Sequence, residues 1–140
     1  MATKKRNDDC STEFGLWLRE RKAISSDYGF ITTNLDYMWM NYKTGYWMYL
    51  EEKRYMKEMS LSQRRIFSKM DTLAQNSKDP NYKGFHFLQF EFTGPDDGHT
   101  FLNREYISVK ELTEFLAFEK SWEDIQKAHK NINITKSFEF

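Results

Sequence analysis

The sequence predicts an α/β fold in which a central mixed sheet is flanked by helices. Three observations favour this class: an aromatic-rich hairpin between Asn34 and Lys53, a Phe-rich run with strand character over residues 84–93, and helix starts marked by capping boxes at Ser60 and Ser108. Helical and extended segments therefore alternate along the chain, and this alternation is typical of α/β proteins.

At 140 residues the chain has the length of one domain. We expect a single domain over residues 11–140, preceded by a flexible basic arm over residues 1–10. Lys4, Lys5 and Arg6 in this arm either contact phosphate or belong to a solvated tail. The 21 basic and 21 acidic residues cancel, so a nucleic-acid partner would have to be held by a local basic patch.

Cys10 is the single cysteine, which excludes a disulfide framework and a cysteine-based zinc site and fits a reducing compartment. No apolar stretch reaches transmembrane length, and none follows the basic N-terminus. We therefore expect a soluble, intracellular protein in the cytoplasm that does not bind membranes. The three histidines have no metal-binding spacing and no glycine-rich phosphate loop is present, which disfavours zinc-enzyme and nucleotide-binding functions.

The first helix is expected from Ser11 to about Ile24, because apolar residues recur there at helical spacing. We expect it to pack against the sheet and to be followed by a short strand over residues 28–32. Glu13 and Glu20 lie at the border of its apolar face, where each either faces a site or is solvated.

The hairpin brings two carboxylates together. If residues 42–45 form a four-residue loop, Asn41 opposes Tyr46, and the antiparallel ladder then places Asp36 opposite Glu51. Lys53 shares their face because strand side chains alternate with a period of two. Opposed Cβ atoms lie roughly 4.5–5.5 Å apart, so the two carboxylates repel unless a cation or a proton intervenes.

Hard oxygen ligands of this kind suit Mg²⁺ or Mn²⁺ better than zinc. Apolar residues occupy both faces of the hairpin, including Leu35 on the face opposite the carboxylates, so we expect the hairpin to form the centre of the sheet.

A second helix is expected from the capping box at Ser60 to about Asn76. Gln63 in this box has two interpretations: it caps the helix, or it points at the carboxylates. Arg64 and Arg65 either contact phosphate or belong to a solvated helix face.

The C-terminal third is expected to add a turn at residues 94–98, a further strand over residues 100–107 and a helix that begins after Ser108. A short helix over residues 122–129 and an irregular tail would complete this strand and helix extension.

The order helix, short strand, hairpin, helix, strand over residues 11–93 resembles the αβββαβ core of the PD-(D/E)XK nuclease superfamily, the restriction-endonuclease-like fold. Asp36 matches the family's first acidic residue in the second core strand, and Glu51-Glu52-Lys53 matches its (D/E)-x-K in the third. Leu35 stands where many members have a proline. Residues 94–140 would be a family-specific extension.

The resemblance implies a metal-dependent endonuclease or exonuclease that hydrolyses phosphodiester bonds in DNA, with RNA not excluded and a homodimer as one assembly. Asp36 and Glu51 would hold Mg²⁺, for which Mn²⁺ can substitute, with the Glu52 carbonyl as a further ligand. Lys53 would orient the attacking water or stabilise charge on phosphorus. Gln63 matches a glutamine that some branches carry in the helix after the motif. The candidate nucleic-acid contacts are Arg21, Arg64, Arg65, Tyr42 and Lys43.

Three other interpretations remain. Glu51, Glu52 and Lys53 could simply keep a strand end soluble. The chain could be a binding module that retains the nuclease fold without cleavage, recognising nucleic acid or a protein. It could also be an interaction or inhibitor protein of a mobile element.

Overall fold

The computed structural model describes residues 12–130, and the chain divides into an N-terminal unit up to Thr32 and a second unit from Thr33 onward. The predicted arm over residues 1–10, Cys10 and the C-terminal tail therefore lie outside the described residues. Within residues 12–130, none of the helices is long and apolar enough to cross a membrane.

The N-terminal unit contains the short helix α1 (Glu13–Arg19) and two 3-10 turns, η1 (Lys22–Ile24) and η2 (Ser26–Tyr28). Thr12 caps α1, because its hydroxyl accepts the Gly15 N–H at 3.0 Å. The predicted helix to Ile24 is wrong: α1 ends at Arg19 and buries none of its side chains, so packing gives it no reason to continue.

The strand predicted over residues 28–32 is also wrong. Gly29 follows η2 with a φ of +92°, a left-handed conformation that glycine adopts without strain and that interrupts an extended run.

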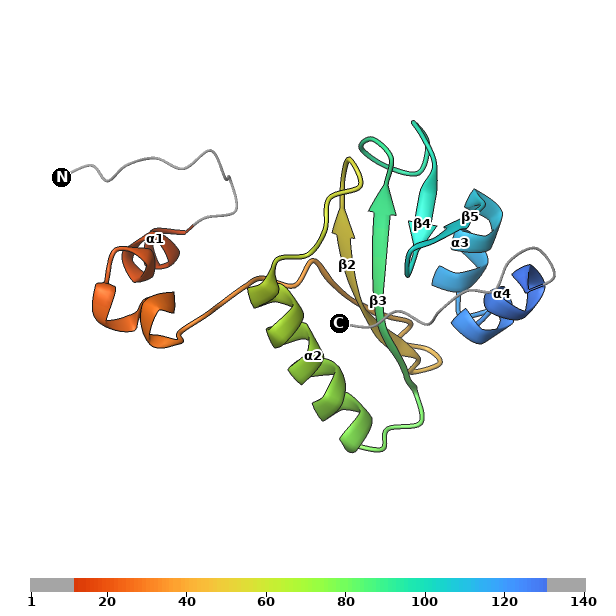
Figure 1. Ribbon diagram of the computed structural model, residues 1–140. Helices are drawn as coiled ribbons and strands as arrows, with labels where there is room; N and C mark the ends of the chain where they lie inside the picture. Colours follow the sequence, from red (N-terminus) through yellow and green to blue (C-terminus); the bar gives the residue numbers. More distant parts are fainter. Residues whose placement is uncertain (1–11, 131–140) are drawn as a thin grey trace. The chain divides into compact units, whose positions relative to one another are not determined.

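The second unit is built on a mixed sheet, which confirms the α/β class. In the described residues the sheet has five strands in the order β1 (Tyr37–Met40), β2 (Trp47–Lys53), β3 (Tyr82–Phe90), β4 (Thr100–Leu102) and β5 (Glu105–Ile107). Neighbouring strands are antiparallel except β2 and β3, which are parallel. Helix α2 (Leu61–Asn76) makes the crossover that this parallel pair requires (Figure 1).

The register of the β1–β2 hairpin confirms the count from the sequence. Tyr37 lies opposite Leu50 and Met40 opposite Trp47. The turn closes with the Asn41 N–H donating to the Tyr46 carbonyl at 2.9 Å, as a four-residue loop over residues 42–45 requires.

The prediction that this hairpin is the centre of the sheet is wrong. β1 is an edge strand and all four of its side chains are exposed, whereas β3 is in the middle and its last six residues, 85–90, are buried. Leu35 also packs on the α2 side of the sheet and not on the opposite face. Apolar residues occur on both faces of central strands and of edge strands alike. This sequence pattern therefore could not show whether β1 lies in the middle or at the edge of the sheet.

Helices cover the two sides of the sheet, with α2 on one side and α3 (Val109–Leu116) and α4 (Trp122–His129) on the other (Figure 1). The α2 side buries a cluster of four large side chains: Met59, Phe67, Phe85 and Phe87. The opposite side buries a larger cluster: Met48, Leu50, Leu88, Phe90, Leu102, Ile107, Leu112, Phe115, Trp122 and Ile125.

Capping boxes open the three helices of the second unit. Ser60 and Gln63 form the box of α2, as predicted, and its end at Asn76 also agrees. Ser108 begins the next helix in the same way, and a box at Ser121 begins the predicted helix over residues 122–129.

The single strand predicted over residues 100–107 is a hairpin of two strands, β4 and β5. Asn103 and Arg104 both have positive φ, 50° and 72°, which forms the two-residue turn typical of tight hairpins. No glycine marks this turn in the sequence. Asn103 also accepts the Phe87 N–H through its side chain at 2.9 Å, which fixes the turn against β3.

Candidate active site

The hairpin register places Asp36 and Glu51 side by side at the open end of the hairpin. Asp36 precedes β1 by one residue, and its N–H donates to Glu51 Oε1 at 3.1 Å. In return, Asp36 Oδ2 accepts the Glu52 N–H at 2.9 Å. These two backbone-to-side-chain hydrogen bonds join the chain just before β1 to β2, and they hold the two carboxylates at adjacent positions, as the sequence predicts.

Glu51 is almost completely removed from solvent, with 2% of its surface exposed. It lies beside Phe87 in the parallel pairing with β3, on the side of the sheet that α2 covers. Burial and the nearby charge of Asp36 raise the pKa of Glu51 to about 7, although the Asp36 N–H and Lys53 oppose this change. A bound cation would offset both the cost of burying the Glu51 charge and its repulsion from the Asp36 carboxylate.

Lys53 and Gln63 both approach the same oxygen of Glu51. The Lys53 ammonium lies 3.7 Å from Oε2, and the Gln63 side-chain N–H donates to Oε2 at 3.3 Å. Gln63 Oε1 meanwhile accepts the Ser60 N–H at 3.0 Å. Both sequence-based interpretations of Gln63 therefore hold, because one end of its amide caps α2 and the other end contacts the buried carboxylate.

Glu52 points away from this cluster. Its carboxylate accepts the Tyr37 hydroxyl at 2.9 Å, and alternation along β2 places it on the face opposite Glu51. Glu52 could therefore contribute to a metal site only through its backbone carbonyl, which is the role that the resemblance implies for it.

The donor set fits a hard divalent cation. Asp36 and Glu51 offer carboxylate oxygens at neighbouring positions, and the Glu52 carbonyl is a third oxygen of the same kind. No group of three or more His, Cys, Asp or Glu side chains able to hold a metal occurs in the described part of the chain. Two carboxylates completed by backbone and water oxygens suit Mg²⁺, which keeps several of its waters when bound, better than zinc.

A groove of about 370 Å³ opens beside Asp36 and Lys53, and Glu51 does not line it. We call it the basic groove, because three of its six lining residues are cationic: Asp36, Glu52, Lys53, Arg54, Tyr55 and Lys57. Arg54, Tyr55 and Lys57 are not among the site residues predicted from the sequence, although they follow the Glu51-Glu52-Lys53 motif almost directly.

Four predicted nucleic-acid contacts belong to the second unit. Arg64 and Arg65 line a shallow hollow in the first turns of α2, close in sequence to Gln63. Tyr42 and Lys43 lie in the hairpin turn, directly after Asn41. Asn41 is five residues along the strand from Asp36. At about 3.4 Å per residue, that places them roughly 17 Å from the carboxylates, so the fold does not bring them into this cluster.

The remaining predicted contact, Arg21, belongs to the N-terminal unit. Its guanidinium lies over the Trp17 ring at 4.4 Å and 3.9 Å from the Glu20 carboxylate. Glu13 lies in the first turn of α1. The contribution of Glu13, Glu20 and Arg21 to the site stays a prediction, because they belong to the N-terminal unit and the residues around Glu51 belong to the second.

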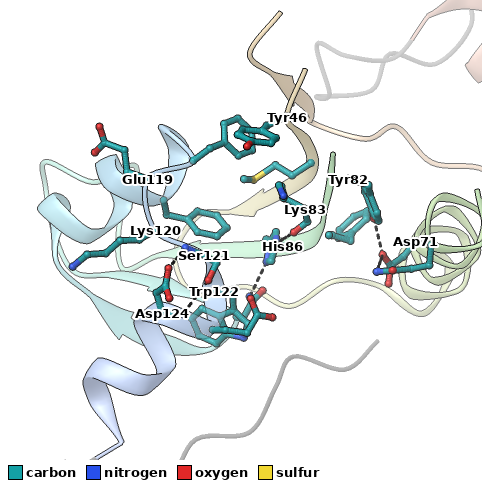
Figure 2. A pocket seen from close by; sticks show the side chains of 18 residues that line it. Tyr46, Asp71, Tyr82, Lys83, His86, Glu119, Lys120, Ser121, Trp122 and Asp124 are labelled. Carbon is teal, nitrogen blue, oxygen red and sulfur yellow. Dashed lines mark hydrogen bonds between the residues drawn. The ribbon is translucent and has the colours of Figure 1, made fainter. Parts of the chain in front are cut away.

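A larger cavity of about 580 Å³ lies elsewhere, mostly on the α3 and α4 side, around the start of β3 (Figure 2). It contains none of the residues around Glu51. His86, which is 6% exposed, lines it, and His86 Nε2 donates to the Lys83 carbonyl at 2.7 Å while Nδ1 accepts from the Asn103 amide at 3.0 Å. Burial lowers the pKa of His86, so it is a neutral core histidine with both nitrogens satisfied.

Comparisons with protein-family models, curated proteins and solved structures gave no match to this chain.

Proposed function

We propose that this protein is a metal-dependent nuclease of the PD-(D/E)XK type that hydrolyses phosphodiester bonds, with DNA as its substrate. One observation carries the proposal: the buried carboxylate of Glu51 lies beside Asp36 and within 3.7 Å of the Lys53 ammonium. The hairpin, the following helix and a strand parallel to β2 support a restriction-endonuclease-like core, although a strand before the hairpin is missing from the described residues.

Each residue has a distinct role in this proposal. Asp36 and Glu51 would bind the cation at the end of the hairpin, and Gln63 would fix the orientation of Glu51. A bound Mg²⁺ would supply Lewis-acid activation of water and of the phosphate. Lys53 would donate to a phosphate oxygen and offset the charge that develops on phosphorus. Its amine is only partly exposed, which strengthens this interaction relative to a fully solvated lysine.

The test is cleavage of labelled supercoiled, linear and single-stranded DNA in the presence of Mg²⁺ or Mn²⁺. We expect Asp36→Asn and Glu51→Gln to abolish cutting and Lys53→Met to slow it about 100-fold or more. Asp96→Asn and Lys69→Met are matched controls, because they remove the same charges at exposed positions and should leave the rate unchanged.

Calorimetric titration with Mn²⁺ separates the nuclease from its alternatives. Metal binding lost in Glu51→Gln and retained in Asp96→Asn would support the site. Absence of both cleavage and metal binding in the folded wild-type protein would contradict the proposal and favour the non-catalytic binding module. RNA of the same sequence, tested in parallel, would decide between the two nucleic acids.

A further inference from the structure

The segment that follows β2 has an uncommon backbone. Tyr55 and Met56 are consecutive, neither is glycine, and both have positive φ, 57° and 56°. The left-handed conformation costs a non-glycine residue roughly 1–2 kcal/mol. Such a pair persists only where the surrounding structure holds it in place.

Residues of β3 and the segment after it supply that restraint. The Tyr55 N–H donates to the Phe92 carbonyl at 3.0 Å, and the Met56 N–H donates to the Phe90 carbonyl at 2.9 Å. Gln89, which is 2% exposed, donates its side-chain amide to the Lys57 carbonyl at 2.9 Å. The segment is therefore fixed along its length, and the loops after β2 and β3 lie at the same end of the sheet (Figure 1).

This fixed backbone presents an exposed aromatic ring in the basic groove. Tyr55 is 57% exposed although its own N–H is engaged, and Arg54 and Lys57 on either side of it are also exposed. Phe92, whose carbonyl accepts from Tyr55, is a second exposed aromatic residue at 46%. An exposed ring with a cation on either side of it in the sequence, all three lining one groove, suits base stacking with phosphate contacts beside it.

We propose that the basic groove binds single-stranded nucleic acid, with an unpaired base stacked on Tyr55 and the flanking phosphates held by Arg54 and Lys57. The inference rests on the proposed function, because it names the substrate of the same site. A base within a duplex is already stacked on both faces, so Tyr55 can reach only a base that is unpaired or extruded. Asp36 and Lys53 line the same groove, which would bring the bound strand to the candidate active site.

Glycine at position 55 gives a sharp test, because it removes the ring while favouring the left-handed backbone. We expect Tyr55→Gly to stay folded and to weaken binding of a fluorescently labelled 20-nucleotide single strand, measured by anisotropy in EDTA and again in Ca²⁺. Loss of one base–aromatic stack corresponds to a weakening of about 5- to 150-fold. Tyr55→Phe should bind within about threefold of the wild type, because it keeps the stacking face.

Controls separate stacking from general attraction. Tyr106→Ala removes a similarly exposed tyrosine, 54% exposed, that lies on β5 and does not line the basic groove, and it should leave affinity unchanged. Arg54→Gln and Lys57→Gln should each weaken binding and reduce its salt dependence by about 0.7 in the logarithmic slope. The duplex of the same sequence should bind more weakly than the single strand and be insensitive to Tyr55→Gly.

The two proposals fail separately. Single-strand binding that depends on Tyr55, without cleavage of any DNA, would support the proposed role of the basic groove and contradict the proposed nuclease activity. Metal-dependent cleavage, together with unchanged single-strand affinity in Tyr55→Gly, would support the proposed nuclease activity and overturn the proposed role of the basic groove. Binding that is weakened in Tyr106→Ala but not in Tyr55→Gly would also overturn the groove proposal.

Discussion

At the scale of single residues, the site depends on the charge state of Glu51. Its pKa of about 7 lies above the ordinary glutamate value of 4.5 because burial, first, and the charge of Asp36, second, disfavour ionisation. The folded protein therefore holds a proton that the unfolded chain has released between about pH 4.5 and pH 7. Folding stability should fall as the pH rises through this window.

Glu51→Gln removes this dependence, since glutamine does not titrate. We expect the variant to be more stable than the wild type at pH 8, by on the order of 3 kcal/mol at most, and the difference to fall below about 1 kcal/mol near pH 5. Urea denaturation at both pH values measures it. Equal effects of the substitution at the two pH values would contradict this account.

Mg²⁺ should increase the folding stability of the wild type at pH 8 and leave the folding stability of Glu51→Gln unchanged.

At the scale of elements, the first turn of α2 joins the helix to the site. Gln63 completes a capping box through Oε1 and contacts Glu51 through its amide nitrogen. A glutamate serves equally well in a capping box, as Glu111 does at the start of α3. Gln63→Glu therefore preserves the cap and changes only the group that faces Glu51.

We expect Gln63→Glu to destabilise the protein at pH 8 by about 1–3 kcal/mol, because Glu51 loses a donor and gains a like charge. Near pH 5 the loss should be much smaller, since Glu51 is then protonated. Ser60→Ala is the control: it removes the hydroxyl that caps α2, and should cost about 1 kcal/mol at both pH values. Circular dichroism during urea titration gives both results, and a pH-independent loss in Gln63→Glu would refute the coupling.

The same elements show which features the sequence could predict. The hairpin register followed from the length of its turn, and α2 followed from Ser60 and Gln63, because these signals are local. The exposed position of β1 could not be predicted, since it depends on β3 pairing with β2. The β4–β5 turn was missed because Asn103 and Arg104 adopt the left-handed conformation without a glycine to mark it.

The basic groove escaped prediction for a related physical reason. The conformation of residues 55–57 is held by hydrogen bonds to the Phe92 and Phe90 carbonyls and from the Gln89 amide, all more than 30 residues away in the chain. No short-range pattern contains that information. Asp36 and Glu51 could be paired from the sequence because a single turn connects them, whereas Tyr55 needs the β2–β3 crossover to be known first.

At the scale of the whole second unit, β5, α3 and α4 meet at one histidine. His129 Nε2 lies 2.7 Å from Glu111 on α3, and Nδ1 lies 2.6 Å from the buried Glu105 on β5. The contact with Glu105 is an ion pair when His129 is protonated. Burial lowers the pKa of His129, but the hydrogen bond with Glu111 and the charges of both glutamates outweigh it and raise the pKa overall.

A raised histidine pKa fixes the sign of the pH dependence. The stabilisation from protonated His129 is complete below its unfolded pKa of about 6.5 and is lost as the pH rises through the higher folded value. We expect His129→Gln to destabilise the protein more at pH 6 than at pH 8.5. His99→Gln is the matched control, because that histidine pairs with Glu91 at an exposed turn and joins no helix to the sheet. A loss in His129→Gln that is the same at both pH values would mean that the histidine acts through packing alone, whereas the expected difference would establish that charge attaches α4 to the rest of the unit.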